Sequence, residues 1–349
     1  NHIFCSRQNY YLRTLRNTEK LLIMANNKLR IGTRGSPLAL TQANLVIDAL
    51  KHVHPNLKEK SAIEMIVIKT TGDRIQSTLL SEVGGKGLFT KEIDEAMLND
   101  RIDIGIHSMK DMPTILPDGI VFHTIMARED ARDAFISDKA TSIEDLAQGS
   151  SIGTASLRRK SQLLSYRPDL TVLPIRGNVD TRLQKIKEGI IDATLLAYAG
   201  LKRLGKDREI KQLIDTKVIL PAVGQGALAA TCRGDDAYAN TVLALLSEPT
   251  TTAAIVAERA MLAVLDGSCH TPIGGLAQPD GQGHLELRGL VALPDGAKTA
   301  EVTMTAPITK AEDLGKSVGE NLLIKAGPDI LNFLEEGKPL FIRPHPEAE

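Results

Sequence analysis

Short apolar runs alternate with amphipathic stretches from residue 28 to about residue 230, and this rhythm limits the folds open to the chain. The run KLRIGT at 28–33 has the pattern of a strand. Residues 36–53 have the spacing of a helix, with Ser36 as N-cap and Pro37 in the first turn. The alternation continues with apolar runs at 63–70, 102–108 and 120–127 and a helical stretch at 90–100. This alternation predicts an α/β sheet with helices on both faces.

A second block of the chain repeats this plan. The stretch IGTASLRRK at 152–160 echoes IGTRGSPLA at 31–39, since each places Gly-Thr and a small polar residue between a strand and a helix. Candidate crossings between the blocks lie near 126–135 and 218–230. We therefore expect two α/β domains of similar plan, hinged around a cleft that would be the default ligand site.

The pattern changes after about residue 248 and predicts a small α+β domain. A helix over 250–267, closed by Gly267, precedes strand-like runs at 284–293 and 300–306 and helices to about residue 336. The expected limits are 28–128 with 221–246 for a discontinuous domain 1, 129–220 for domain 2, 247–340 for domain 3, and 341–349 for a tail.

Residues 1–27 differ from the rest and are left out of the fold prediction. Their first twenty residues carry three arginines, one lysine and one acid. We interpret residues 1–27 as an extension that is disordered or not native, with Met24 as the true start, because the ordered pattern begins at Lys28. An organellar transit peptide is the alternative.

Composition excludes several classes of protein. Aromatic residues make up 3% of the chain, and tryptophan is absent, which argues against a base-stacking nucleic-acid surface and a membrane-interface belt. No apolar run approaches the roughly 20 residues that cross a bilayer. The three cysteines, Cys5, Cys232 and Cys269, form neither a disulfide framework nor a CxxC motif. We therefore expect a cytoplasmic protein that binds neither nucleic acid nor membrane and holds no metal.

Positive charge is concentrated between residues 151 and 203, although the whole chain has a net charge of −1. Ten Lys/Arg and four acids give this segment a net charge of +6. Cations normally avoid helix N-termini, yet Arg158, Arg159 and Arg182 lie in first turns, Arg176 ends a predicted strand, and Arg34 repeats the arrangement in domain 1. This pattern indicates an anionic ligand at the strand ends, whereas solvated helix faces explain Lys185, Lys187 and Lys202.

The anion is better matched by carboxylates than by a nucleotide. The stretch GGKGLF at 84–89 has glycine after Lys86, where a P-loop requires Ser or Thr, and is better interpreted as a mobile loop. No G-x-G-x-x-G follows a strand. Arginine forks bind carboxylates well, so several arginines favour a ligand with many carboxylates.

The stretch IHSMKDMP at 106–113 places Lys110 and Asp111 at another strand end. A carboxylate in a basic crevice should remain ionised, and it could stabilise a developing cation or transfer a proton. A turn-forming aspartate before Met-Pro explains the pattern equally well.

The third cysteine stands in the loop DGSCHTPIGG at 266–275. A zinc site at Cys269 and His270 would need two further ligands, and none is evident. A Cys/His nucleophile pair would need a histidine that opposes the thiol in space. Cys5 and Cys232 are interpreted as structural residues.

Eight motifs in order together resemble the porphobilinogen deaminase family, also called hydroxymethylbilane synthases. They are IGTRGSPLAL, GGKGLF, DIGIHSMKDMPT, IGTASLRRKSQL, IRGNVDTRL, AGLKRLG, PAVGQGALA and GSCHTPIGG. The resemblance implies two domains like type II periplasmic binding proteins and a small third domain. It also implies that four porphobilinogen molecules are joined head to tail, with release of ammonia, to give 1-hydroxymethylbilane.

The resemblance also implies roles for single residues. A dipyrromethane primer would be held by a thioether to Cys269, and Asp111 would assist loss of ammonia, stabilise the azafulvenium cation and aid proton removal. Positions that match cofactor-binding residues are Ser108, Lys110, Thr154, Ser156, Arg158 and Arg159. Positions that match substrate-binding residues are Arg34, Ser36, Arg176 and Arg182, and Lys86 lies in the mobile loop.

One departure and one alternative accompany the resemblance. Ser268 stands where many relatives have glycine, which could alter loop hydrogen bonds without affecting the thioether. The alternative is a non-catalytic two-domain protein that binds polycarboxylates, since a fold alone does not imply catalysis. A monomer is expected, because no long apolar stripe requires a partner.

Overall fold

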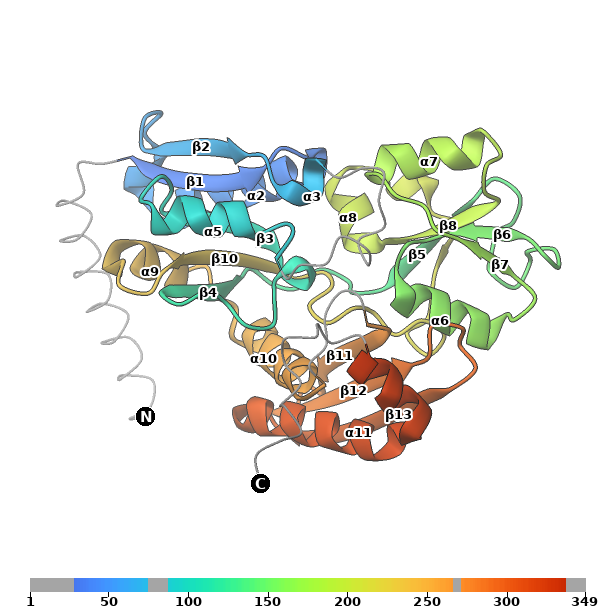
Figure 1. Ribbon diagram of the computed structural model, residues 1–349. Coiled ribbons are helices and arrows are strands. Elements are labelled where there is room, and N and C mark those ends of the chain that lie inside the picture. The colour runs from blue at the N-terminus through green and yellow to red at the C-terminus, as the bar shows by residue number, and fades with distance from the viewer. Residues whose placement is uncertain (1–27, 75–86, 266–270, 337–349) are drawn as a thin grey trace, which may run out of the picture. The chain divides into compact units, whose positions relative to one another are not determined.

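The computed structural model describes residues 28–74, 87–265 and 271–336 (Figure 1). These residues form two compact units. The first unit comprises 28–74, 87–128 and 227–252, and the second comprises 129–226, 253–265 and 271–336. Each unit is described by itself.

The first unit contains a five-stranded mixed sheet in the order β2-β1-β3-β10-β4. Strands β1, β2 and β3 are parallel, whereas β10 runs antiparallel to both β3 and β4. The late strand β10 thus returns the chain to the first sheet. The elements are β1 (Leu29–Arg34), α2 (Pro37–Val53), η1 (Pro55–Lys58), β2 (Ile63–Ile68), α3 (Thr71–Arg74), α5 (Lys91–Leu98), β3 (Ile104–Ser108), η2 (Met109–Asp111), β4 (Ile120–Ile125), β10 (Leu228–Arg233) and α9 (Ala237–Ala244).

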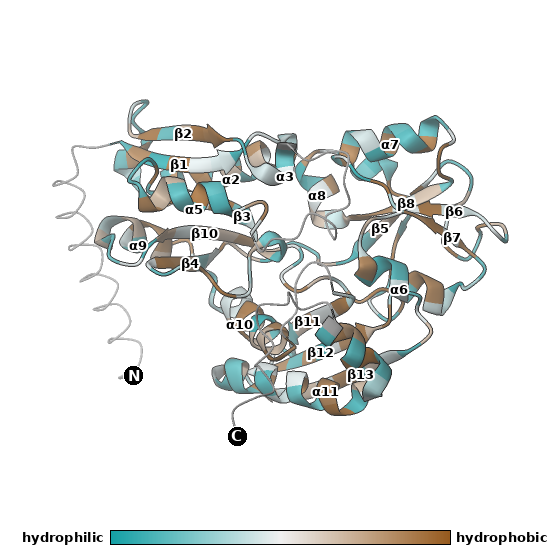
Figure 2. Ribbon diagram, in the orientation of Figure 1, coloured by the Kyte–Doolittle hydropathy of each residue, from teal (hydrophilic) through white to brown (hydrophobic). Residues whose placement is uncertain are grey.

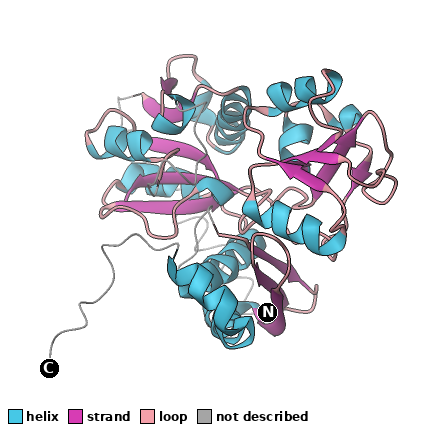
Figure 3. Cartoon of the chain, turned by 45° about the vertical axis from the view of Figure 1, so that its right-hand side comes forward, coloured by secondary structure: helices cyan, strands magenta, loops and turns pink. Residues whose placement is uncertain are grey.

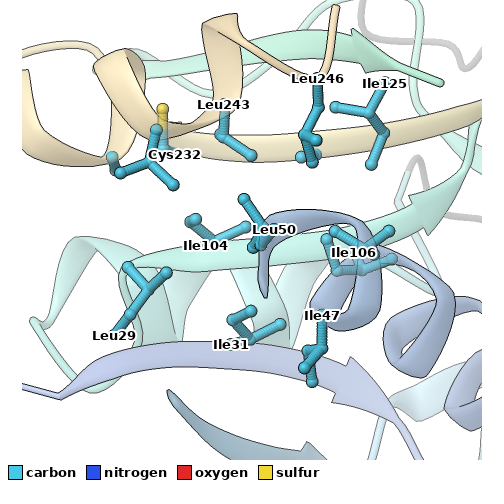
Figure 4. Close-up of a cluster of buried hydrophobic side chains, with 14 of the residues drawn as sticks. Leu29, Ile31, Ile47, Leu50, Ile104, Ile106, Ile125, Cys232, Leu243 and Leu246 are labelled. Atoms are coloured by element: carbon cyan, nitrogen blue, oxygen red, sulfur yellow. The ribbon is translucent and has the colours of Figure 1, made fainter. Parts of the chain in front are cut away.

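Apolar periodicity explains how this unit closes its core. Ser36 caps α2 by accepting a hydrogen bond from the Ala39 N–H, and Pro37 occupies the first turn, as predicted. The buried face of α2 then packs on alternate residues of β1 and β3, and α9 covers the same core from the β10 side (Figure 4). Cys232 belongs to this core, and burial raises the pKa of its thiol to about 12, which supports a structural role.

The second unit contains a sheet of the same plan, in the order β7-β6-β8-β5-β9. Strands β6, β7 and β8 are parallel, and β5 runs antiparallel to β8 and β9. The start of β5 therefore lies at the same edge as the carboxyl ends of the parallel strands. The elements are β5 (Asp133–Ser137), β6 (Ser151–Gly153), α6 (Leu157–Tyr166), β7 (Thr171–Leu173), α7 (Val179–Lys187), β8 (Ala193–Ala197), α8 (Tyr198–Arg203), η3 (Asp207–Glu209) and β9 (Gln212–Leu213).

A third, antiparallel sheet forms the small α+β region, in the order β11-β12-β13. The helix α11 packs on β12 and β13 and is interrupted at Gly327, whose φ is 72°, directly before Pro328. Its elements are α10 (Pro249–Val264), β11 (Ile273–Pro279), β12 (His284–Ala292), β13 (Thr299–Pro307), η4 (Ile308–Lys310) and α11 (Ala311–Glu336). Figure 3 distinguishes the strands, in magenta, from the helices, in cyan.

The predicted fold class, α/β with a small α+β region, is confirmed. Strands such as β4 and β5 are largely hydrophobic, whereas helices such as α5 and α7 mix hydrophobic and hydrophilic residues (Figure 2).

The limits of several elements differ from the predicted ones. Strand β7 ends at Leu173, so Arg176 lies in the following loop rather than at a strand end. Helix α10 ends at Val264, and the predicted stop at Gly267 lies outside the described residues. Among the described residues, no helix is long and apolar enough to cross a membrane.

Candidate functional site

A small pocket in the first unit opens at the carboxyl ends of β1 and β3. Its volume is about 50 Å³. The polar residues that line it come from the β1–α2 turn, from α2 itself, from the residue before α5 and from the β3–η2 segment; they are Arg34, Ser36, Gln42, Thr90, His107, Ser108 and Asp111. Four predicted site residues therefore share one pocket: Arg34, Ser36, Ser108 and Asp111.

Arg34 is held from two sides. Its Nη2 lies 2.5 Å from the Oδ1 of Asp73, and its guanidinium lies 4.1 Å from the centre of the Phe89 ring. Burial tends to raise the pKa of Asp73, but hydrogen bonds from Arg34 and Thr70 outweigh it, so this pKa is lowered. The guanidinium is therefore oriented at the pocket by a partner that remains ionised.

Two serines present hydroxyl groups to the pocket. Ser36 is the N-cap of α2, so its position is set by the helix start. Ser108 ends β3, and its Oγ accepts a hydrogen bond of 2.8 Å from the Nε2 of Gln42, a buried residue of α2. Gln42 was not singled out in the sequence, because a polar residue on the apolar face of a helix gives no distinctive signal.

Asp111 is exposed and ends the one-turn helix η2 that follows β3. Lys110, one residue earlier, is half-buried. The turn-forming and the functional interpretations of Asp111 are compatible, since the residue closes a turn and also lines the pocket.

The second unit holds a basic cluster at the matching edge of its sheet, formed by Arg158, Arg159, Arg176, Arg182 and Asp133. Arg158 and Arg159 begin α6 and are 5% and 6% exposed. The Nη2 atoms of both arginines lie 2.8 Å from the carboxylate of Asp133, which is fully buried at the start of β5. These two arginines are therefore not solvated side chains, and they share a single carboxylate.

The two arginines change the pKa of the carboxylate that they share. Burial tends to raise the pKa of Asp133, but Arg158 and Arg159 lower it far below its usual range. Gln225 also donates a hydrogen bond of 2.8 Å to this carboxylate. Two guanidinium groups against one carboxylate leave one positive charge in excess at a buried position.

Arg176, in the loop after β7, and Arg182, on the following helix α7, add further positive charge. Arg182, on α7, donates from Nε to the Gly177 carbonyl at 3.0 Å. Burial, together with the charges of Arg159 and Arg176, lowers the pKa of Arg182 to about 10. Arg182 thus lies close enough to Arg159 and Arg176 to be repelled by both, and an anionic ligand would offset this repulsion.

Thr154 and Ser156 stand in the β6–α6 turn beside this cluster. Ser156 caps α6 by accepting a hydrogen bond from the Arg159 N–H, and the Thr154 Oγ1 accepts one from the Ser156 N–H at 3.2 Å. Two other predicted site residues, Lys86 and Cys269, lie outside the described residues.

Sequence reasoning missed Asp133. It lies in the stretch 126–135, which we interpreted as a domain crossing, and β5 was not predicted. The available signal was an acid directly before the apolar run 134–136, since an acid at a buried strand start needs a cation.

Comparison with known proteins identifies the family. Residues 29–241 match the family described as porphobilinogen deaminase, dipyromethane cofactor binding domain, and residues 252–324 match the porphobilinogen deaminase C-terminal domain. The chain is 52% identical to the chloroplastic porphobilinogen deaminase of Pisum sativum, over 87% of this chain and 83% of that protein. It is 49% identical to the porphobilinogen deaminase of Nitrobacter winogradskyi, over 85% of this chain and 93% of that protein.

Solved structures with a similar fold include a periplasmic substrate-binding protein from Coxiella burnetii. That match has 14% identity and a TM-score of 0.39, and it covers 64% of this chain and 94% of that one. A TM-score this low supports no argument about this chain. The two family matches and the relatives carry the conclusion instead: this chain belongs to the porphobilinogen deaminase family.

Proposed function

We propose that the pocket of the first unit and the basic cluster of the second are the parts of this chain that carry out the porphobilinogen deaminase reaction. In this reaction four porphobilinogen molecules are joined head to tail on a dipyrromethane primer, ammonia is released, and 1-hydroxymethylbilane is formed. The observation that carries the assignment is the excess positive charge around Asp133, since each porphobilinogen brings an acetate and a propionate group.

The donor set fits a dipyrromethane cofactor, which has four carboxylates. Hydroxyl, ammonium and guanidinium groups are all carboxylate donors. Those that would hold the cofactor are Ser108 and Lys110 in the first unit and Thr154, Ser156, Arg158 and Arg159 in the second. When bound through a thioether to Cys269, the cofactor supplies the primer on which the chain grows.

The arginine pair would bind such a ligand with charge that is already oriented. Arg159 directs Nε and Nη2 at Asp133, and Arg158 directs Nη1 at the Leu220 carbonyl and Nη2 at Asp133. Both guanidinium planes are therefore held before a ligand arrives, which reduces the entropy lost on binding. Asp133 has the role of a positioning residue.

Asp111 is the proposed catalytic residue. Its exposed carboxylate shares a pocket with Arg34 and Ser36, so a substrate whose carboxylate contacts Arg34 would bring its reacting carbon near an anion. Such an anion would stabilise positive charge that develops as ammonia leaves, and it could accept a proton after coupling.

Four residues are proposed to bind the carboxylates of the incoming porphobilinogen. Arg34 and Ser36 would act from the first unit, and Arg176 and Arg182 from the second. Because Arg34 already pairs with Asp73, a substrate carboxylate would share this guanidinium rather than find it unpaired. Lys86 would act from the mobile loop that the resemblance implies.

The test is the intact mass of the native protein beside a Cys269→Ser variant, both produced where porphobilinogen is made. We expect the native mass to exceed the polypeptide mass by one dipyrromethane and the variant to have the bare polypeptide mass. A bare native mass would refute the covalent cofactor. A non-catalytic polycarboxylate-binding protein would also show the bare mass, together with no release of ammonia from porphobilinogen.

Three further predictions belong to this proposal. The chain is expected to act as a monomer and to divide at the three-domain limits given above. It is also expected to act in the cytoplasm, although the similar proteins of Pisum sativum and Oryza sativa are named chloroplastic. Size-exclusion chromatography with light scattering and fluorescence microscopy of a tagged full chain would test the first and the last.

A further inference from the structure

Gln162 is a buried polar residue of α6 to which neither the motif comparison nor the proposed mechanism assigns a role. It is 5% exposed and lies one helical turn after Arg158, on the same face of the helix. A glutamine amide carries one acceptor and two donor hydrogens, so it is stable at a buried position only with partners. The partners of Gln162 therefore indicate what the residue does.

Side chains of α6 make all the hydrogen bonds that the described residues form with the backbone of Leu220. The Leu220 N–H donates to the Oε1 of Gln162 at 2.7 Å, and the Leu220 carbonyl accepts from the Nε2 of Gln162 at 3.1 Å. The Nη1 of Arg158 donates to the same carbonyl at 2.6 Å. Because a backbone N–H can only donate, the atom of Gln162 that faces it is the amide oxygen. Gln162 thus pairs with Leu220 as a neighbouring strand would.

The Leu220 carbonyl is one of two acceptors that hold the guanidinium of Arg158. The other is the Asp133 carboxylate, 2.8 Å from Nη2. Asp133 is held in place by strand β5, whereas Leu220 lies in the irregular segment between β9 and β10. Gln162 bonds to both the N–H and the carbonyl of Leu220, so it gives this segment the fixed position that a sheet gives to Asp133. The orientation of Arg158 therefore depends on Gln162 at its Nη1 end.

The other contacts of this segment reach the small α+β region. The Leu220 side chain belongs to an apolar cluster with Leu276 of β11. The carbonyl of Pro221 accepts a hydrogen bond from the Gly275 N–H of β11 at 2.9 Å. A Cβ at Gly274 would stand 3.1 Å from the Leu220 carbonyl oxygen, so glycine permits the close approach. Leu220 thus joins α6 to β11.

This joint lies between two proposed points of cofactor attachment. Strand β11 begins at Ile273, four residues after Cys269 in the chain. A cofactor bound to that cysteine and also to Arg158 and Arg159 would be held at two points, one before β11 and one on α6. Binding at two points is strong only when both can be reached at once, so a shift of α6 against β11 would weaken it.

We propose that Gln162 is a positioning residue for cofactor attachment, which holds Arg158 in register with β11 through Leu220. The inference rests on the proposed function and adds the element that aligns the two attachment points. Gln162 contacts neither cofactor nor substrate in this proposal. It acts through Leu220 and Arg158, so its loss should slow the formation of the covalent adduct.

The test follows cofactor attachment in time. The full chain is produced in cells that lack porphobilinogen, porphobilinogen is added, and the intact mass is recorded as the dipyrromethane adduct forms. Gln162→Met keeps an unbranched side chain but removes the amide, so attachment should slow ~10-fold, the equivalent of about one lost hydrogen bond. The matched control is Gln212→Met on β9, whose amide bonds to the Ile143 N–H and to Glu144. It should leave the rate of attachment unchanged.

Gln162→Glu provides a second variant in case Gln162→Met does not fold. Its carboxylate still accepts from the Leu220 N–H, so its urea midpoint should remain near that of the wild type. It cannot donate to the Leu220 carbonyl, and it offers Arg158 a competing anion, because both residues reach the same carbonyl oxygen. Attachment should therefore still be slow. A wild-type rate of attachment in either folded variant would overturn the inference.

A double-mutant cycle tests whether the effect passes through Arg158. Arg158→Lys should itself slow attachment, because an ammonium group lacks the fork that reaches both Leu220 and Asp133. In that background Gln162→Met should slow attachment by no more than about twofold further, since residues that act through one contact are not additive. Fully additive effects would show that Gln162 supports only the fold, contrary to the proposal.

The wild-type chain separates this inference from the proposed function. Normal attachment in the wild type and in a folded Gln162 variant removes the inference alone. A wild-type chain that gains no adduct from porphobilinogen and releases no ammonia removes the proposed function and this inference with it.

Discussion

Each α/β unit of this protein buries an aspartate, and the pKa values of the two carboxyl groups are shifted in opposite directions. Asp133 in the second unit is fully buried between two arginines, and its pKa is lowered. Asp94 on α5 of the first unit is 5% exposed, and burial raises its pKa to about 6, although Thr90 opposes the shift. Its Oδ1 finds no hydrogen-bond partner among the described residues. Burial alone disfavours the charge, and only the paired cations of the second unit reverse that effect.

The strand-to-helix turns of the two units share a backbone but differ in how their cations are paired. Ser36 and Ser156 cap α2 and α6 through the same hydrogen bond, so the backbones are alike. In the first unit a half-buried cation, Arg34, precedes the turn and is balanced by Asp73. In the second unit two buried cations follow the turn and share one carboxylate. The same local fold thus provides an adaptable pocket in one unit and a fixed excess of positive charge in the other.

The largest expected effect is that of Asp111→Asn on turnover. Loss of the pocket carboxylate should lower kcat for porphobilinogen by ~10²–10⁴-fold, the usual contribution of a positioned acid–base group. The covalent cofactor should still be present by intact mass, since its carboxylates are held elsewhere. Near-normal formation of 1-hydroxymethylbilane would refute the catalytic role of Asp111.

Asp133→Asn should have the largest effect on stability. It leaves two buried guanidinium groups without an anion, at a cost of about 3–5 kcal/mol in the free energy of unfolding. The contribution of Asp133 is present above the ordinary aspartate pKa and is lost only in strongly acidic solution, because its folded-state pKa is lowered. Urea unfolding at pH 7 measures the loss. The control, Asp73→Asn, removes a more exposed partner and should cost under about 1 kcal/mol.

Arg159→Ala should separate ligand binding from chemistry. It removes a charge-assisted partner worth roughly 1.5–3 kcal/mol, so the variant should fail to assemble its primer and show the bare polypeptide mass. Arg167→Ala is the matched control, since Arg167 is the C-cap of α6, at the opposite end of the helix from Arg159, and pairs there with the half-buried Asp169. Full cofactor occupancy in Arg159→Ala would contradict the assignment of the second unit.

Asp94→Asn should stabilise the protein at neutral pH. Because the folded-state pKa is raised from 3.8 to about 6, ionised Asp94 destabilises the fold above pH 6, and this effect fades as pH falls toward 3.8. The variant should gain on the order of 1–3 kcal/mol at pH 8 and little at pH 4 by urea unfolding. An equal gain at both pH values would show that the ionised carboxylate is not the cause. Asp48→Asn, at an exposed position of α2, serves as control.

The smallest effects concern the two caps. Ser36→Ala and Ser156→Ala should each cost about 1 kcal/mol of unfolding free energy, because each removes one N-cap hydrogen bond. Their functional effects should differ, with Ser36→Ala raising KM and Ser156→Ala reducing cofactor occupancy. Identical functional effects in the two variants would remove the distinction between the units.

Sequence patterns predicted most of the helices and strands, but not the order in which the strands pair. The Ser36 cap, the helix after it and the echo at 152–160 are local properties, set by propensity and by periods of two and 3.6 residues. Strand β5 was missed because its five residues begin with an acid and follow a charged stretch. The expected discontinuous domain 1 anticipated that the chain returns to the first sheet, but the strands that flank β10 were not predicted, since pairing across more than a hundred residues leaves no local mark.

The sequence by itself determined the fold class, the positive charge at the second strand-to-helix turn and, through eight motifs in order, the family. Only the tertiary structure decided which groups pair with that charge. Asp133 and Arg158 are 25 residues apart, and Thr231 and His107 are 124 apart. Burial and partner choice depend on which strands become neighbours, so the lowered pKa of Asp133, the raised pKa of Asp94 and the lowered pKa of His107 could not be inferred from residue type. Their states follow from the low dielectric of a closed core and from the few groups that the fold brings within hydrogen-bond distance.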